Sequence, residues 1–226
     1  ISQRKGIAVK KLIRDQYAVK CSELLPIPWL ALMGEAGTGK TTVARRLAEN
    51  CLGASFGETL GSMLKGAYLG QTKLRVAAII NKLQQKEGAG HPAVLFIDEA
   101  YSLFENDDDY ASEVIEMILA IASSKDGYRI DVSDVSEERR IAAGLADQNN
   151  QALREVVVHR NTAIWLGGYE ERLRHSFRVN EGLSRRFAYQ ITIPTPSLDE
   201  LYELFCKLFR NRKLNPTDEH KVREFL

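Results

Sequence analysis

Short apolar runs alternate along this chain with longer stretches in which apolar residues recur every three or four positions. Continuous runs of this length are typical of buried β-strands, and the wider spacing is typical of helices with one buried face. Strands that alternate with helices favour a parallel sheet covered on both faces, which is an α/β fold. The expected strands are residues 28–33, 93–97, 162–166 and 189–193, and the expected helices are residues 7–24, 40–51, 76–83 and 114–122.

The pattern changes after residue 195. Ser197 and Glu200 have the spacing of a capping box, in which two side chains satisfy backbone N–H groups at the start of a helix. Apolar residues at helical spacing follow this box. We therefore predict two domains: an α/β domain over residues 1–195, and the beginning of a small helical domain over residues 196–226.

A glycine-rich segment lies between the first expected strand and the helix expected at residues 40–51, and it matches the pattern GxxxxGK[ST] in full. Glycines let backbone N–H groups wrap around phosphates, and the following helix points the positive end of its dipole at them. We expect Lys40 to reach the β- and γ-phosphates of ATP and Thr41 to hold Mg²⁺. The predicted nucleotide-binding residues here are Gly34, Glu35, Ala36, Gly37, Thr38, Gly39, Lys40, Thr41 and Thr42.

Two carboxylates, Asp98 and Glu99, follow the second expected strand. In open α/β sheets the carboxyl ends of the strands face the ligand crevice. We expect Asp98 to bind Mg²⁺ through water, and Glu99 to orient and deprotonate the water that attacks ATP. An acidic helix cap is the alternative interpretation. Together with the phosphate loop, the pair predicts ATP hydrolysis, and the glutamate distinguishes the chain from P-loop kinases.

Three further segments, residues 96–103, 164–169 and 180–187, resemble the CbxX/CfxQ family of AAA+ ATPases. That family includes the red-type Rubisco activase and the AAA+ component of type VII secretion. The resemblance begins near Gly6 and continues to the end of the chain. It implies a parallel αβα P-loop NTPase sandwich followed by a small helical lid domain. It also implies assembly into a ring, usually a hexamer, that remodels a protein client.

The resemblance implies roles for individual residues as well. Arg186 matches the arginine finger, which reaches the ATP site of the neighbouring subunit and neutralises charge on the transferring phosphoryl group. Arg185 is the second candidate, and two arginines on a solvated loop are the alternative interpretation. Tyr169 lies where many AAA+ proteins have a polar sensor residue, which makes it a candidate nucleotide contact. An ordinary aromatic residue at a strand end is the alternative.

A loop containing Tyr68, Leu69 and Gly70 matches the family's aromatic–aliphatic–glycine loop, which lines the central pore of the ring. An aromatic side chain can grip any polypeptide through apolar contact, and glycine lets the loop bend. A buried aromatic residue in a turn is the alternative. The chain departs from the family at residues 123–160, a longer connection than usual, where we expect either a hairpin with a helical tip or a surface insertion without a role.

Composition narrows the range of partners. The 226 residues carry a formal net charge of +1, which provides no overall field for nucleic acid. No apolar run approaches the roughly 20 residues that span a bilayer. Three distant cysteines exclude a complete disulfide framework and favour a reducing compartment, the cytoplasm or an organelle.

The expected function is therefore ATP-driven remodelling or threading of a protein client by a ring-shaped homo-oligomer, with ATP and Mg²⁺ as cofactors. The alternative is a nucleotide-dependent switch or scaffold, similar to clamp loaders or to DNA-associated AAA+ proteins. The near-zero net charge argues against DNA, and the loop containing Tyr68 argues for threading.

Overall fold

The computed structural model of this chain describes residues 27–65, 70–85, 91–104 and 109–209. The chain divides into two compact units, and Ile193 and Pro194 lie on opposite sides of the boundary between them. The unit that contains Ile193 holds the phosphate loop and all four expected strands. The helix expected at residues 7–24 lies outside the described residues.

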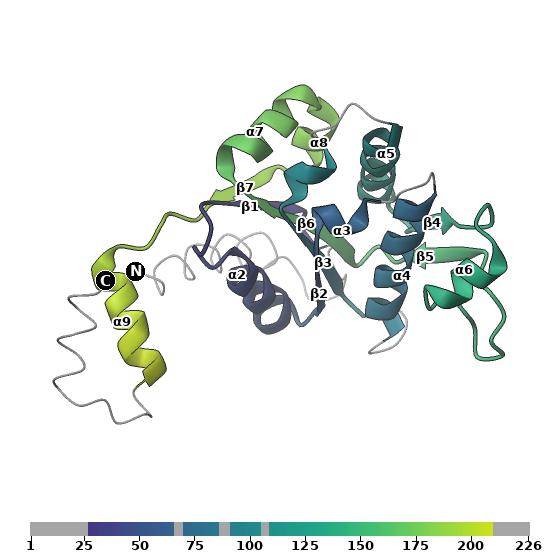
Figure 1. Ribbon diagram of the computed structural model, residues 1–226, viewed down its shortest axis with the longest axis horizontal. Coiled ribbons are helices and arrows are strands. Elements are labelled where there is room, and N and C mark those ends of the chain that lie inside the picture. Colours follow the sequence, from purple (N-terminus) through teal and green to yellow (C-terminus); the bar gives the residue numbers. More distant parts are fainter. Residues whose placement is uncertain (1–26, 66–69, 86–90, 105–108, 210–226) are drawn as a thin grey trace. The chain divides into compact units, whose positions relative to one another are not determined.

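Five strands form one sheet: β1 Leu30–Met33, β2 Ser55–Leu60, β3 Ala93–Asp98, β6 Thr162–Gly168 and β7 Tyr189–Thr192. Their order across the sheet is β2-β3-β6-β1-β7, and all of the pairings are parallel (Figure 1). Ala31 in β1 lies in register with Leu166 on one side and Gln190 on the other. Because the strands run in one direction, their carboxyl ends meet at a single edge of the sheet, which is where ligands bind in such folds.

Helices cover both faces of this sheet, which confirms the predicted α/β P-loop NTPase fold class. Among the described residues of the unit that contains the sheet, the helices are α2 Lys40–Arg46 with the π-helical turn η1 Leu47–Cys51, α3 Gly61–Leu64, α4 Gln71–Gln85, the 3-10 helix η2 Ala100–Leu103, α5 Asp109–Ser123, α7 Glu170–Val179 and α8 Glu181–Arg186, together with α6 Glu137–Ala142 in the insertion. Ala31 and Met33 join the core shared with α4, α5, α7 and α8, whereas Leu30 and Leu32 are buried on the opposite face. Figure 1 shows α2 across the sheet from α5, α7 and α8.

The sequence pattern misses the edge strand β2. Burial falls along this strand, from the buried residues Ser55 and Phe56 to the exposed residue Glu58. An edge strand has one neighbour, here β3, so it lacks the continuous apolar run of a central strand. At Gly57 an added Cβ would lie 2.8 Å from the Leu83 side chain, so α4 packs directly on the backbone of the strand.

The insertion between α5 and β6 forms a separate antiparallel pair, β4 Tyr128–Asp131 and β5 Glu155–Val158, with α6 in the connection. Gln84 of α4 ties this hairpin to the sheet. Its Nε2 donates to the carbonyl oxygen of Val157 at 2.7 Å. Its Oε1 accepts from the backbone N–H of His159 at 3.1 Å and from the Thr162 hydroxyl at 3.0 Å. The insertion therefore packs on α4 rather than projecting freely.

The connection between β4 and α6 approaches the start of α4. Asp134 forms a salt bridge of 3.0 Å with Lys73, and an added Cβ at Gly70 would lie 3.4 Å from the Asp134 carboxylate. In the same connection, hydrogen bonds from the hydroxyl and the backbone N–H of Ser133 lower the pKa of Asp131. The insertion thus reaches the glycine at which the predicted pore loop meets α4.

In the second unit, α9 Leu198–Phe209 begins with the predicted capping box. The backbone N–H of Ser197 donates to the Glu200 carboxylate at 2.9 Å, and the backbone N–H of Glu200 donates to the Ser197 hydroxyl oxygen at 3.3 Å. These two bonds satisfy N–H groups that the first turn of a helix leaves without partners. Across the described ranges, no helix combines the length and the apolar composition needed to cross a bilayer.

Candidate functional site

The phosphate loop connects the carboxyl end of β1 to the start of α2, and glycine shapes its backbone. Gly37 and Gly39 have φ angles of 75° and 85°, in the left-handed region that other residues rarely adopt. At Gly34 an added Cβ would lie 2.4 Å from the carbonyl oxygen of Ile193, so no larger residue fits without a shift of the backbone. The loop leads into the first turn of α2, whose backbone N–H groups favour an anion.

Lys40 begins α2, and only 6% of its surface is exposed. Its ammonium group donates hydrogen bonds to the carbonyl oxygens of Gly34 and Glu35, each at 2.9 Å. The same group lies 5.7 Å from the centroid of the Tyr169 ring. The loop therefore curls around this cation. Charged phosphate oxygens would attract it more strongly than the neutral carbonyls do.

Asp98, at the end of β3, faces Thr41 in the first turn of α2. The Thr41 hydroxyl donates to Asp98 Oδ2 at 3.3 Å, and Asp98 Oδ1 accepts from the backbone N–H of Glu99 at 3.0 Å. Mg²⁺ prefers oxygen ligands and is commonly held by one or two protein groups together with water and substrate phosphates. The Thr41 hydroxyl and the Asp98 carboxylate, 3.3 Å apart, supply two such oxygens and would leave the remaining positions to water and phosphate.

Two glycines at the end of β6 make room for this arrangement. A Cβ added at Gly167 would lie 2.8 Å from Asp98 Oδ1 and 2.4 Å from the Phe96 ring. A Cβ added at Gly168 would lie 2.9 Å from the Tyr101 ring. The paired glycines thus let the acidic end of β3 and the segment after it pack against β6.

Glu99 has an unusual backbone conformation for a residue with a side chain. Its φ of 51° and ψ of 38° lie in the left-handed region. It occupies the N-cap position of η2, yet its side chain makes no capping hydrogen bond. This geometry does not support the acidic-cap interpretation. Backbone strain next to a ligand edge is typical of functional residues, so Glu99 stays the predicted base.

Tyr169 belongs to a row of aromatic rings and cations, in which the planes of Tyr169 and Tyr101 are inclined by 38°. Its ring has Lys40 on one side, and its centroid lies 6.0 Å from that of Tyr101. The Arg172 guanidinium lies 3.7 Å from the centroid of the Tyr101 ring. The sequence pattern points to Tyr169 but not to Tyr101 or Arg172. The one available signal was that Tyr101 lies two residues after Glu99, in a segment that resembles the family.

Arg186 lies at the end of α8 and contacts the end of α5. Its Nε and Nη2 donate to the Ser123 hydroxyl oxygen at 3.1 Å and 2.8 Å, on an exposed surface. Arg185 instead forms an exposed salt bridge of 3.1 Å with Glu181. An arginine finger acts on the ATP of a neighbouring subunit. Arg186, exposed and bonded to α5 rather than to its own phosphate loop, therefore stays the predicted finger.

The predicted pore residues Tyr68 and Leu69 lie outside the described residues. Gly70, which follows them, is buried and has a φ of 80°, a conformation that favours glycine. Its backbone N–H donates to the Glu113 carboxylate at 3.4 Å. The end of the predicted loop is thus anchored to α5.

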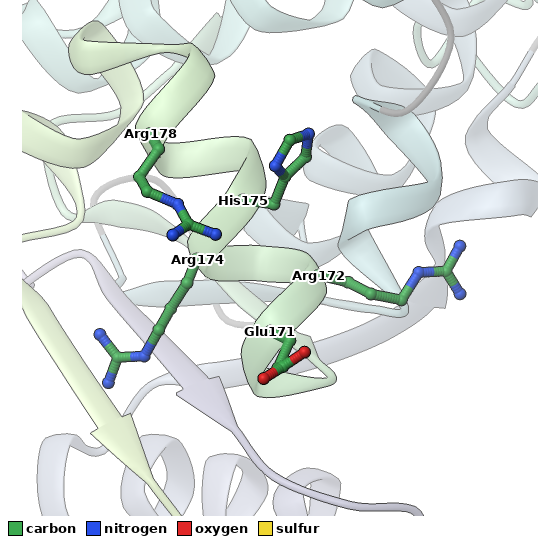
Figure 2. Close-up of a pocket in the computed structure, with 5 residues that line it drawn as sticks. All are labelled: Glu171, Arg172, Arg174, His175 and Arg178. Carbon is green, nitrogen blue, oxygen red and sulfur yellow. The ribbon is translucent and has the colours of Figure 1, made fainter.

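A surface hollow runs along α7 and is lined by Glu171, Arg172, Arg174, His175 and Arg178. Figure 2 shows that these side chains fan out from the helix rather than converge on one point. A small-molecule site needs polar groups that converge within a largely apolar cleft. We therefore assign no ligand to this hollow.

The sequence is similar to known proteins. Residues 30–135 match the ATPase family associated with various cellular activities (AAA). The plasmid-encoded protein CbxX of Cupriavidus necator is 31% identical over 201 residues, which are 85% of this chain and 51% of that protein. Protein CbbX of Cereibacter sphaeroides is 28% identical over 211 residues, 89% of this chain and 55% of that protein.

A chloroplast protein is similar as well. The ribulose bisphosphate carboxylase/oxygenase activase of Cyanidioschyzon merolae is 27% identical over 199 residues, 84% of this chain and 52% of that protein. The chain therefore spans about half the length of the curated relatives it matches.

Proposed function

We propose that this chain, which is a AAA ATPase related to the CbxX and CfxQ proteins, hydrolyses ATP and couples hydrolysis to remodelling of a protein partner within a ring of subunits. The observation that carries the proposal is the contact of 3.3 Å between the Thr41 hydroxyl and the Asp98 carboxylate. Lys40 precedes Thr41, and Glu99 follows Asp98. The contact between Thr41 and Asp98 therefore brings their neighbours Lys40 and Glu99 to the carboxyl edge of the sheet as well. We assign Lys40 as the phosphate-binding cation, Thr41 and Asp98 as oxygen ligands, and Glu99 as the base.

In the proposed reaction Lys40 binds the β- and γ-phosphates, and Thr41 and, through water, Asp98 would hold Mg²⁺. Bound Mg²⁺ supplies positive charge that offsets the charge developing on the phosphate oxygens. Glu99 accepts a proton from the attacking water. The water oxygen bonds to the γ-phosphorus as the bond from that phosphorus to the β–γ bridging oxygen breaks, and ADP and inorganic phosphate leave. Tyr169, beside Lys40, contacts the nucleotide.

We also propose that the chain acts on a protein client and assembles into a ring. One relative is named an activase of ribulose bisphosphate carboxylase/oxygenase. Its name thus describes an action on a second protein, the carboxylase. Tyr68, Leu69 and Gly70 match a loop that lines the pore of related rings. In a homo-hexamer or larger ring, located in the cytoplasm or another reducing compartment, Arg186 would serve the neighbouring ATP site and Tyr68 would touch the client.

The test separates ATP binding from ATP hydrolysis. Glu99→Gln should bind ATP but nearly stop phosphate release, because the attacking water loses its base. A pull-down from native lysate with this variant and ATP should retain the client, which mass spectrometry can identify. Wild-type protein should release the same client as it hydrolyses ATP. Lys40→Ala, which lacks the cation for the phosphates, is the matched control and should retain nothing above background.

Two outcomes would change the assignment. Full ATPase activity in Glu99→Gln would remove this glutamate from the reaction. A partner held equally by wild-type protein and Glu99→Gln, with no stimulation of the ATPase, would favour the alternative of a nucleotide-dependent switch or scaffold.

A further inference from the structure

A line of contacts leads from the phosphate loop to α7. The Lys40 ammonium lies 5.7 Å from the Tyr169 ring centroid, and the rings of Tyr169 and Tyr101 lie 6.0 Å apart. At the other end, the Arg172 guanidinium lies 3.7 Å from the Tyr101 centroid. Cations attract the faces of aromatic rings, so a cation at each end holds the two rings in place. Tyr169 is the N-cap of α7 and Arg172 lies in its first turn, so this row of contacts fixes the start of the helix.

The other end of α7 contacts the segment that carries Arg186. Phe177 of α7 stacks on Phe187, with ring centroids 5.9 Å apart and planes inclined by 23°. Phe187 directly follows Arg186, and Trp29 packs edge-on against Phe187 at 5.5 Å. The ten residues of α7 make a helix about 15 Å long. Asn180 separates α7 from α8, so the contact between Phe177 and Phe187 links α7 to the segment that carries the arginine.

We propose that α7 couples the protein's own phosphate site to Arg186. While Lys40 is bonded to the loop carbonyls, this row of contacts holds α7 as observed, and Arg186 is bonded to the end of α5. When Lys40 turns to bound phosphates, the cation leaves the Tyr169 ring, α7 shifts, and Arg186 separates from α5. Tyr101 and Arg172 are positioning residues for this change. The inference rests on the proposed function in one respect, which is that Arg186 then serves the ATP of a neighbouring subunit.

Trp29 can report the movement. The chain has two tryptophans, so Trp165→Phe leaves Trp29 as the only one. Trp29 precedes β1, whereas the phosphate loop follows it, and four residues of β1 extend over about 13 Å. Trp29 and the phosphate loop thus lie at opposite ends of β1. A change in Trp29 emission on ATP binding would have to pass through the protein.

The experiment titrates Mg²⁺ and ATP into the Trp165→Phe protein and records Trp29 emission, while calorimetry measures ATP affinity. ATP should change the emission. Arg172→Met should remove most of this change and alter ATP affinity about fivefold, since coupling between two sites is reciprocal. Arg174→Met is the matched control. Arg174 lies on the same helix and is bonded to Glu170 at 2.8 Å, so both readouts should stay as in the parent.

A second measurement does not depend on the tryptophan background. Hydrogen exchange over residues 181–187 of the otherwise unaltered protein should rise when ATP binds, and this rise should be lost in Arg172→Met but kept in Arg174→Met. Tyr101→Phe retains the ring, so it should behave as the wild type does.

The measurements distinguish failure of the proposed coupling from failure of the proposed function. If Arg172→Met binds ATP and keeps the full change in Trp29 emission and in exchange, the coupling is overturned and the proposed function stands. Unchanged emission and exchange in a wild-type protein that binds ATP overturn the coupling in the same way. Absence of ATP binding to the wild-type protein overturns both.

Discussion

Each oxygen of the Asp98 carboxylate has its own partner, the Thr41 hydroxyl on one and the Glu99 backbone N–H on the other. The contact with Thr41, at 3.3 Å, is already long for a hydrogen bond between oxygens. A small displacement of the carboxylate would therefore separate the two groups that we propose to hold Mg²⁺. Gly167 permits the observed position of the carboxylate, because a side chain there would lie 2.8 Å from Asp98 Oδ1 and push it away.

We predict that Gly167→Ala lowers both stability and Mg²⁺-dependent ATPase activity. The new methyl group would lie 2.4 Å from the Phe96 ring and 2.8 Å from Asp98 Oδ1. Such overpacking should cost about 1–3 kcal/mol of stability and should raise the Mg²⁺ concentration needed for half-maximal activity. Thermal unfolding and a Mg²⁺ titration of the ATPase measure the two effects.

Gly168→Ala is the matched comparison for Gly167→Ala. Its methyl group would meet the Tyr101 ring rather than Asp98, at 2.9 Å. It should lower the melting temperature with little effect on the Mg²⁺ requirement. An unchanged Mg²⁺ requirement in Gly167→Ala would contradict our placement of the cation.

Sequence motifs predict the side chains that would touch the phosphates and Mg²⁺ better than the side chains that support them from further away. Lys40 belongs to the glycine-rich loop pattern, and Asp98 directly follows an apolar strand, so both can be recognised from a few neighbouring residues. The contact of Arg172 with Tyr101 joins residues far apart in the chain, and a cation over a ring leaves no local pattern. The bond from Arg186 to Ser123 was unpredictable for the same reason.

At the scale of elements, burial on both faces decides which strands a sequence reveals. The central strands β1, β3 and β6 are buried along nearly their whole length, so each appears as a continuous apolar run. The edge strand β2 is buried only at its first two residues and contains Gly57, a pattern that fits a turn as well as a strand. Helix 76–83 was expected from its apolar stripe, but its role as the support of the hairpin depends on Gln84, a polar residue.

We predict that Gln84→Met destabilises the protein by about 2–4 kcal/mol. The methionine side chain has a shape similar to that of glutamine, but it lacks the amide that donates and accepts these hydrogen bonds. The Val157 carbonyl, the His159 N–H and the Thr162 hydroxyl would each lose a bond that Gln84 now supplies. Urea unfolding measures the loss. The exposed neighbour Gln85 provides the control, since Gln85→Met should change stability by less than about 0.5 kcal/mol.

A loss for Gln84→Met no larger than that for Gln85→Met would mean that the hairpin is held by its apolar contacts alone. In that event the hairpin strands should also keep their protection from hydrogen exchange in the variant. If the loss is as large as predicted, exchange should rise in β5 first, because Val157 and His159 lose their bonds directly.

At the scale of the assembled molecule, Glu99 and Arg186 should act on the same ATP from different subunits. We predict that Glu99→Gln and Arg186→Ala are each nearly inactive alone and regain ATPase activity when mixed. In a mixed ring, an Arg186→Ala subunit binds ATP and receives the finger of a Glu99→Gln neighbour, which itself binds ATP. Phosphate release from a series of mixing ratios measures the recovery, which should be highest near equal amounts because such a mixture places the two kinds of subunit side by side most often.

A mixture of Lys40→Ala with Glu99→Gln is the control for this experiment. Glu99 acts within the subunit that binds the ATP, so a neighbour cannot replace it and no activity should return. Full activity of Arg186→Ala on its own would assign the finger to another residue, and Arg185 would be the next one to test.

The order of strands in the sheet has a consequence for how the protein is made. Both neighbours of β1 come late in the chain, since Ala31 is in register with Leu166 and Gln190. During synthesis β1 and the phosphate loop leave the ribosome long before any strand that can pair with β1. A fragment limited to residues 30–135, the span that matches the AAA family, would hold Lys40 and Asp98 yet leave an apolar strand exposed. We therefore expect the nucleotide site to form after β6 has been synthesised, so that ATP stabilises the nascent chain only from that point on.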